Sequence, residues 1–268
     1  MKLSIVIAVL ESYEVVKRQI LHFQKMQLPD DIEVIFVDDG SDPGIELSVI
    51  KNIYVIKSYD TRPWSQPCAR NFGASKARGD YLLFTDIDHI LSKEAILAAA
   101  EIGVMITSED YDKMIFPRHW GVLTKEGDID QSKQTLFDYG LQLPVEVMRE
   151  RGLHGGCHPN TFSIKADIFW RLDGYDERYC GRYGGDDVDF SKRYGHLCRK
   201  LHEVKPHIEG PRIWVYPDAR RDKKQMLHSI RRKIGRVERV DPVCPDCELI
   251  YNKCVCYYPK ELSENESV

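Results

Sequence analysis

The sequence has no apolar run long enough to cross a membrane, and it has no strong excess of charge of either sign. Its formal net charge is −4 over 268 residues, so any binding to nucleic acid or to a membrane surface has to be local. A short apolar stretch opens the chain, but Glu11 follows it at once and no cleavage site of small residues appears. We therefore expect a buried first strand rather than a signal peptide, and no membrane partner.

Cysteines are scarce over most of the chain: four are scattered, and the other four lie close together near the C-terminus. This uneven distribution argues against a disulfide framework and favours a reducing compartment with a metal site. We expect a soluble cytoplasmic protein, located in the host cytoplasm if the source is a virus. The composition, with 43% hydrophobic and 30% charged residues, is that of an ordinary globular protein.

The first ninety residues alternate between apolar runs and segments with helical spacing. Expected strands cover residues 3–10, 33–37, 53–56 and 81–85, and expected helices cover residues 12–26 and 69–77. This alternation predicts an α/β fold with a parallel sheet and helices on both faces. In such sheets ligands bind beyond the carboxyl ends of the strands, so the acid-bearing loops after Leu10, Val37 and Thr85 should meet at one edge.

Two carboxylates, Asp86 and Asp88, follow the last of these strands at i and i+2. Paired carboxylates at the carboxyl end of a buried strand suit a hard cation that carries a diphosphate. An Asp-x-Asp pair alone is equally compatible with a solvated turn. The rest of the chain therefore has to decide between these two interpretations.

Three motifs in the first ninety residues together favour the metal site over the solvated turn. They are Val37-Asp38-Asp39-Gly40-Ser41, Ala69-Arg70-Asn71-x-Gly73 and Asp86-Ile87-Asp88. In this order and spacing, residues 3–90 resemble the nucleotide-sugar half of a family 2 glycosyltransferase. The resemblance implies a GT-A fold, which is Rossmann-like, with a mostly parallel sheet and helices on both faces.

The resemblance also implies roles for individual residues. Asp39 is expected to bind the uracil of a UDP-sugar, with Arg70 nearby. Asp86 is expected to meet the ribose side of the nucleotide, and Asp88 to ligate a Mn²⁺ or Mg²⁺ ion that bridges the diphosphate. Glu11 lies where the family usually has a polar aromatic residue or Asn, and we take it as a further nucleotide-sugar contact. The structural alternative is that the acids after Val37 only cap a helix and close a turn.

A second resemblance covers residues 153–194, where Gly184-Gly185-Asp186-Asp187 precedes an expected helix. This region is similar to the C-terminal half of the β-1,4-galactosyltransferase family. The similarity implies that Asp187 is the catalytic base and that Asp186, where a glutamate is commoner, holds sugar hydroxyls. Tyr183 falls where that family has a tryptophan between donor and acceptor. The alternative is that these acids only cap the helix.

The chemistry implied is displacement at the anomeric carbon of the donor sugar. Asp187 would take the proton from the attacking acceptor hydroxyl, and a metal held by Asp88 would neutralise the departing diphosphate. A single base opposite the leaving group predicts inversion. For a third metal ligand we expect Asp218 or His228 equally, with His89 as a further candidate.

The clustered cysteines, Cys244, Cys247, Cys254 and Cys256, form a CxxC-x6-CxC pattern typical of a structural Zn²⁺ site. Disulfides are the alternative. We expect a GT-A domain over residues 1–240, with a nucleotide-sugar half (1–92) and an acceptor half (93–240). A zinc knuckle (241–260) and a disordered tail (261–268) should follow.

A basic segment, residues 220–239, precedes the cysteines and interleaves nine Lys or Arg residues with apolar ones at helical spacing. It is compatible with a solvated face, with diphosphate binding or with a polyanionic acceptor such as DNA. The leading hypothesis is an inverting, metal-dependent UDP-sugar glycosyltransferase that acts on a glycan or glycoconjugate. Alternatives are a virus-type transferase acting on hydroxymethylated DNA and a catalytically inactive nucleic-acid-binding zinc-knuckle protein. A sugar nucleotidyltransferase is disfavoured, because no glycine-rich loop with an arginine follows the first strand.

Overall fold

The computed structural model describes residues 1–46, 50–58, 60, 62, 65–105, 113–120, 122–130, 157–181, 184–201, 208–209 and 213–215. Several expectations fall outside these residues: Tyr183, Asp218, His228, the basic segment, the tail and the four clustered cysteines, Cys244, Cys247, Cys254 and Cys256. They stay predictions. Among the described residues, no helix is both long and apolar enough to cross a bilayer.

The predicted elements of the first ninety residues are confirmed, with the second helix beginning at Gln66 instead of Ala69. The strands are β1 (Leu3–Val9), β2 (Ile32–Asp38), β3 (Ile53–Lys57), β4 (Tyr81–Asp86), β5 (His89–Ile90), β6 (Lys113–Trp120), β7 (Val122–Leu123), β8 (Ile129–Asp130), β9 (Cys157–Lys165), β10 (Ile208–Glu209) and β11 (Ile213–Val215). The helices are α1 (Tyr13–Met26), α2 (Gln66–Lys76), α3 (Lys93–Met105), α5 (Ala166–Arg171) and α6 (Asp186–Leu201), with a 3-10 turn η1 (Glu177–Tyr179).

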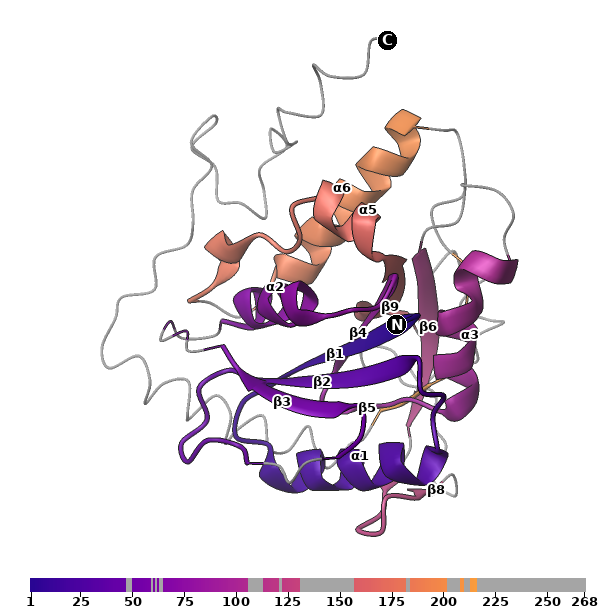
Figure 1. Cartoon of the computed structure of the whole chain (residues 1–268). Helices are drawn as coiled ribbons and strands as arrows, with labels where there is room; N and C mark the ends of the chain where they lie inside the picture. The colour runs from indigo at the N-terminus through magenta and orange to yellow at the C-terminus, as the bar shows by residue number, and fades with distance from the viewer. Residues whose placement is uncertain are drawn as a thin grey trace.

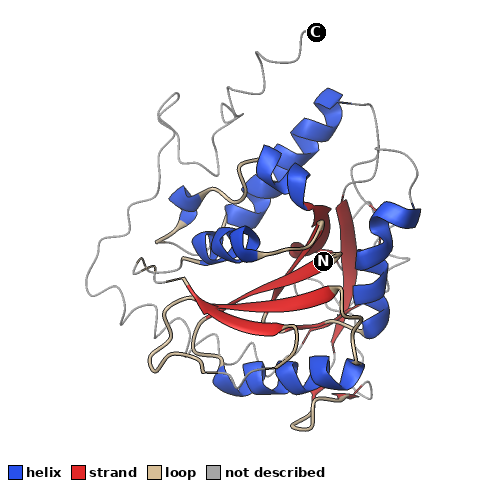
Figure 2. Ribbon diagram, viewed as in Figure 1, coloured by secondary structure: helices blue, strands red, loops and turns tan. Residues whose placement is uncertain are grey.

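The main sheet is mixed, with strand order β3-β2-β1-β4-β9-β6-β11-β5 and β10 paired to β6. The first four strands in this order are parallel, as the sequence predicts. Strand β9 then runs antiparallel to both β4 and β6, in the middle of the sheet (Figure 2). As a result, residues early in β9 lie beside the carboxyl end of β4.

Helices cover both faces of the sheet (Figure 1), and each face has its own apolar core. The alternation of side chains along β1 divides its residues between them: Ile5 and Ile7 pack with α1 and α3, and Val6 packs with α2, α5 and α6. Both cores are built from side chains that are almost fully buried. The sheet is thereby held rigidly between two layers of helices.

Helix α2 lies unusually close to the sheet at Gly73. A Cβ atom added there would come within 2.5 Å of Val6 Cγ1 and 2.7 Å of Val37 Cγ2. Only glycine allows this approach. The close packing brings the first turns of α2 to the carboxyl ends of the parallel strands.

Candidate active site at the carboxyl edge of the sheet

The loops after β1 and β2 lie against each other at the carboxyl edge of the sheet. The backbone N–H of Glu11 donates to Ser41 Oγ at 2.8 Å, and the N–H of Asp39 donates to the carbonyl of Val9 at 2.8 Å. Glu11 has a φ of 53°, which is uncommon for a residue with a side chain. The expected convergence is therefore confirmed for the loops after Leu10 and Val37.

The neighbouring acids Asp38 and Asp39 have different surroundings. The Asp38 carboxylate accepts from the backbone amides of Ser41 and Ile45, both at 2.8 Å, and so fixes the loop. The Asp39 carboxylate accepts from the hydroxyl of Ser65 at 2.6 Å. For Asp38 the structural alternative, an acid that closes a turn, matches these contacts, whereas Asp39 faces the segment that leads into α2.

Arg70 is fully buried at the carboxyl end of β4. Its guanidinium donates to Asp86 Oδ1 at 2.6 Å and to Asn160 Oδ1 at 2.9 Å, and it lies 3.6 Å from Asp186 Oδ2. The guanidinium carbon lies 5.0 Å from the centre of the Tyr175 ring. These contacts tie α2, β4, β9 and α6 to a single cation.

Two acids begin α6, directly after two glycines. Gly184 and Gly185 have φ values of 86° and 99°, and a Cβ built on Gly184 meets none of the described atoms within 4 Å. The positive φ at both positions favours glycine, and at Gly184 no close contact contributes to that requirement. Burial raises the pKa of Asp186 to about 6, which Arg70 opposes. Burial also raises the pKa of Asp187 above its ordinary value.

Three buried polar atoms among these residues have no hydrogen-bond partner in the described part of the chain: Arg70 Nε, Asp186 Oδ2 and Tyr175 Oη. Burial raises the pKa of Tyr175 above its ordinary value, so its hydroxyl keeps its proton at neutral pH. Arg70 opposes this rise in the pKa of Tyr175, whereas Asp186, Asp187 and Asp86 add to it. Buried polar atoms are rarely left unpaired without a functional reason.

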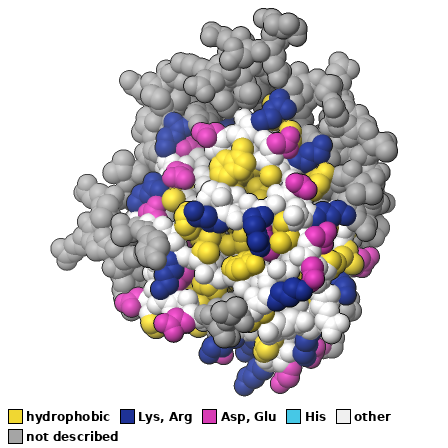
Figure 3. Space-filling view, in the orientation of Figure 1, with side chains coloured by type: hydrophobic (Ala, Val, Ile, Leu, Met, Phe, Trp, Pro, Cys, Tyr) yellow, Lys and Arg dark blue, Asp and Glu magenta, His cyan; other side chains and the backbone are white. Residues whose placement is uncertain are grey.

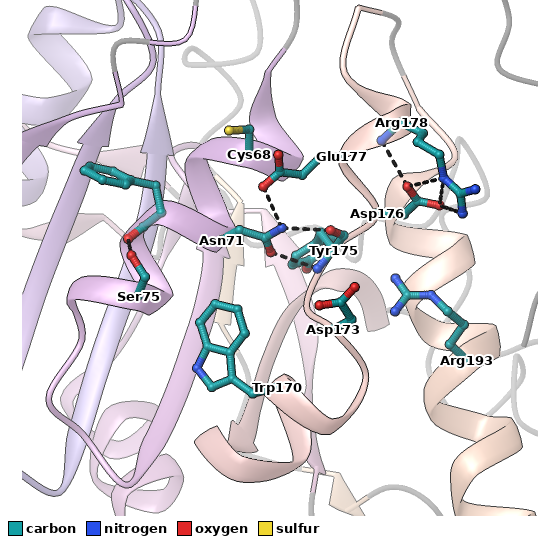
Figure 4. Close-up of a pocket in the computed structure, with 11 residues that line it drawn as sticks. Cys68, Asn71, Ser75, Trp170, Asp173, Tyr175, Asp176, Glu177, Arg178 and Arg193 are labelled. Atoms are coloured by element: carbon teal, nitrogen blue, oxygen red, sulfur yellow. Dashed lines mark hydrogen bonds and ion pairs between the residues drawn. The ribbon is translucent and has the colours of Figure 1, made fainter. Parts of the chain in front are cut away.

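The motif at the start of α2 has a structural explanation at each position. Ala69 is buried, Arg70 reaches the acids, and Gly73 permits the close approach to the sheet. The amide of Asn71 donates to the Tyr175 carbonyl and accepts from the Tyr175 N–H, both at 2.8 Å, as Figure 4 shows. Asn71 therefore fixes the backbone of the residue whose ring lies under Arg70.

Asp86, Asp88 and His89 form a compact group in which the potential ligand atoms lie within 4.8 Å of one another. Asp88 and His89 are buried. His89 Nδ1 contacts the hydroxyl of Thr161, which in turn lies 3.1 Å from the hydroxyl of Thr85. These contacts fix the orientation of the imidazole, as ring partners commonly do for metal-binding histidines. We refer to this group with Arg70, Tyr175, Asp186 and Asp187 as the acidic site.

The structure brings most of the predicted site residues to one edge of the sheet. Arg70, Asp86, Asp88, Asp186 and Asp187 belong to the acidic site, and the loops of Glu11 and Asp39 adjoin each other at the same edge. His89, only a further candidate by sequence, lies with Asp86 and Asp88 in the group that could hold a metal ion.

Other contributors were not predicted as site residues. They are Gln66, whose amide donates to Asp86 at 3.1 Å, together with Asn160, Thr161 and Tyr175. The amide of Asn160 also donates to Asp86, at 3.3 Å. The antiparallel entry of β9 beside β4 brings Asn160 and Thr161 to the site, and no local sequence pattern signals that pairing.

Residues 4–215 match the family described as Glycosyltransferase like family 2. A crystal structure of S. aureus TarS 1–349 is similar in fold, with a TM-score of 0.51 and 15% sequence identity over 90% of this chain and 67% of that one. A second crystal structure of S. aureus TarS has a TM-score of 0.51 and 16% identity, and this chain covers 41% of it.

The mannosyltransferase PcManGT from Pyrobaculum calidifontis, solved in complex with GDP-Man and Mn²⁺, has a TM-score of 0.49 and 12% identity, over 89% of this chain and 65% of that one. No curated protein sequence matches the chain. At identities this low, the two TarS structures indicate a shared fold and no more. Since the family match extends over well more than half of the sequence, the chain belongs to the glycosyltransferase-like family 2.

Proposed function

We propose that the chain transfers a sugar from a UDP-sugar to an acceptor hydroxyl at the acidic site. The observation that carries this proposal is a set of buried atoms that have no hydrogen-bond partner among the described residues: Arg70 Nε, Asp186 Oδ2 and Tyr175 Oη. They offer both hydrogen-bond donors and an acceptor, beyond the carboxyl ends of parallel strands where α/β sheets bind ligands. Sugar hydroxyls, which donate and accept, match such a set.

In this proposal the nucleotide lies along the loops after β1, β2 and β4. Asp39 accepts from the uracil N–H, Glu11 contacts the nucleotide-sugar, and Asp86 meets the ribose side. Arg70 forms ion pairs with Asp86 and with Asp186 at the start of α6, so we assign it to the diphosphate and sugar side of the donor. Its fixed positive charge suits a ligand with several negative charges.

The donor set of Asp86, Asp88 and His89 fits a divalent cation such as Mn²⁺ or Mg²⁺, because two carboxylates and an imidazole converge within 4.8 Å. When bound, this ion would neutralise the charge that develops on the departing diphosphate. Asp218 and His228 are the alternative third ligands.

Asp187 acts as the general base. It takes the proton of the acceptor hydroxyl while the acceptor oxygen bonds to the anomeric carbon and the bond to the diphosphate breaks. The raised pKa of Asp187 makes it a stronger base than an ordinary aspartate. Asp186 holds sugar hydroxyls, and Tyr183 lies between donor and acceptor, in line with the likeness of this half to the β-1,4-galactosyltransferases. One displacement gives inversion.

A glycan or glycoconjugate is the proposed acceptor. Hydroxymethylated DNA is the alternative, supported by the basic segment 220–239 and by the Cys244, Cys247, Cys254 and Cys256 pattern, which we propose binds a structural Zn²⁺. Salt separates the two acceptors: phosphate contacts release counterions, so DNA binding weakens steeply with salt, whereas glycan binding does not.

The test is UDP release from a panel of UDP-sugars with Mn²⁺, first without acceptor, then with hydroxymethylated DNA or with a glycan panel. Slow, metal-dependent hydrolysis of one donor is the expected first result. A large rise with one acceptor class names that class. Absence of both UDP binding and donor hydrolysis would overturn the proposal and favour a nucleic-acid-binding protein.

A further inference from the structure

A cavity of about 600 Å³ lies between the outer side of α2 and the segment from α5 to α6. It is within the range of about 300 to 1,000 Å³ usual for small-molecule sites. Its wall includes Asn71 of α2, Trp170 of α5 and Arg193 of α6, drawn in Figure 4. Of the residues of the acidic site, Tyr175 lines this cavity as well, whereas none of the carboxylates does.

One wall of this cavity carries a buried cation with an unused donor. Arg193 is only 4% exposed, and its guanidinium donates to Asp189 through Nε and to the Leu172 and Gly174 carbonyls through Nη1. Its Nη2 has no partner among the described residues. Figure 4 shows the guanidinium directed toward Asp173.

Asp173 supplies the complementary acceptor. Its side chain is exposed, and it makes no hydrogen bond or ion pair with the described part of the chain. The other acids of the wall are engaged: Asp176 pairs with Arg178 at 2.7 Å, and Glu177 accepts from Asn71 at 3.1 Å. The cavity therefore offers one unused acceptor and one unused donor that face each other.

This combination selects for a neutral polyol. An anion would be repelled by the Asp173 carboxylate and a cation by the Arg193 guanidinium, whereas a hydroxyl group both donates and accepts. Trp170, which is 43% exposed, supplies an indole surface for the apolar C–H face of a sugar ring. Among the described residues on the face seen in Figure 3, basic and acidic side chains are interspersed and form no continuous basic surface.

We propose that the cavity binds a saccharide unit of a neutral glycan, remote from the hydroxyl that reacts at the acidic site. Asp173 accepts from one sugar hydroxyl, Arg193 Nη2 donates to another, and Trp170 stacks on the ring. This inference deepens the proposed function and rests on it, because it assigns the acceptor or product to the glycans. The cavity would hold the enzyme on its glycan between turnovers.

The test is saturation-transfer NMR on the full chain with maltose, lactose and N,N′-diacetylchitobiose, in the presence of saturating UDP and Mn²⁺. At least one sugar should bind while the donor site is filled. Asp173→Asn and Trp170→Ala should each weaken that binding about tenfold or more. Asp173 has a φ of 58°, a conformation that asparagine also tolerates, so Asp173→Asn keeps the backbone.

Asp167→Asn is the matched control. Asp167 is an exposed acid on α5, the helix that carries Trp170, and it does not line the cavity. It should leave sugar binding unchanged. Absence of binding by all three sugars, or binding unaffected by both cavity variants, would overturn the inference. The inference would also be overturned if none of the sugars bound and Asp173→Asn bound duplex DNA more tightly than the wild type does. UDP binding is measured by calorimetry on the same samples and tests the proposed function separately. If UDP does not bind, the measurement of sugar binding to the cavity remains valid.

Discussion

The guanidinium of Arg70 donates to Asp86 over 2.6 Å from a side chain with no solvent exposure. The ammonium of Lys51 lies at the same distance from Asp30, but those side chains are 72% and 79% exposed. The two ion pairs therefore have the same length but very different exposure to solvent. Burial makes the loss of one partner costly in the first pair, and solvent makes it cheap in the second.

Arg70→Met should lower the free energy of unfolding by about 3–5 kcal/mol at pH 8, because Asp86 and Asp186 lose their shared cation. Lys51→Met should change it by less than about 1 kcal/mol. Urea denaturation of both variants measures the contrast. Equal, small effects would show that the buried cation does not stabilise the site.

Asp187→Asn should lower turnover by about 10²- to 10⁴-fold while UDP binding is retained, since it removes the proposed base and nothing from the donor loops. The wild-type rate should fall as the pH drops through a pKa above the ordinary value of 3.8, because burial raises that pKa. Initial rates of UDP release against pH provide both measurements. Unchanged turnover in this variant would refute the assigned base.

Asp186→Asn should change the stability of the protein in a way that depends on pH. Because burial raises the folded-state pKa of Asp186 from 3.8 to about 6, the protonated form favours folding. Its contribution is complete below about pH 4 and is lost as the pH rises through 6.

The asparagine resembles the protonated acid, so the variant should match the wild type near pH 4. Above pH 7 it should be more stable, by up to about 3 kcal/mol. Thermal unfolding at the two pH values measures this. A variant less stable than the wild type at both pH values would contradict the raised pKa of the buried Asp186 carboxyl.

Tyr175→Phe removes a buried hydroxyl that has no partner in the described structure. Without ligand the variant should be as stable as the wild type or slightly more so, since an unpaired polar atom is removed. With substrates present, kcat/KM should fall about tenfold if the hydroxyl donates to the bound sugar. Tyr54→Phe, on the exposed residue of β3, is the control and should leave kcat/KM unchanged. A drop in stability without a kinetic effect would assign Tyr175 to packing alone.

Asp88→Asn and His89→Gln should each weaken Mn²⁺-dependent UDP binding by about 10- to 100-fold, because each removes a member of the ligand group. Asp128→Asn, in the exposed turn before β8, is the control. Calorimetry with and without EDTA measures the metal-dependent part. UDP affinity that is insensitive to EDTA would argue against a metal at this group.

The sequence predicted the parallel half of the sheet well, because buried parallel strands are continuous apolar runs and the acids that follow them are local features. Asp86 and Asp88 were recognisable for the same reason, and Asp186 and Asp187 were recognisable from the glycine pair that precedes them. Asn160, Thr161 and Tyr175 were not, because their role depends on β9 pairing antiparallel with β4 and on Asn71 fixing a loop 104 residues away. Long-range pairing of this kind leaves no periodic pattern.

The bonds around Arg70 also bear on how the protein folds. Its partner Asn160 is 90 residues away along the chain, and Asp186 and Tyr175 come later still. A fragment that ends at residue 92 would contain all three N-terminal motifs, yet its arginine would keep Asp86 and lose these other neighbours. The contacts of Arg70 are therefore complete only after the ribosome has synthesised the chain as far as Asp186, at the start of α6.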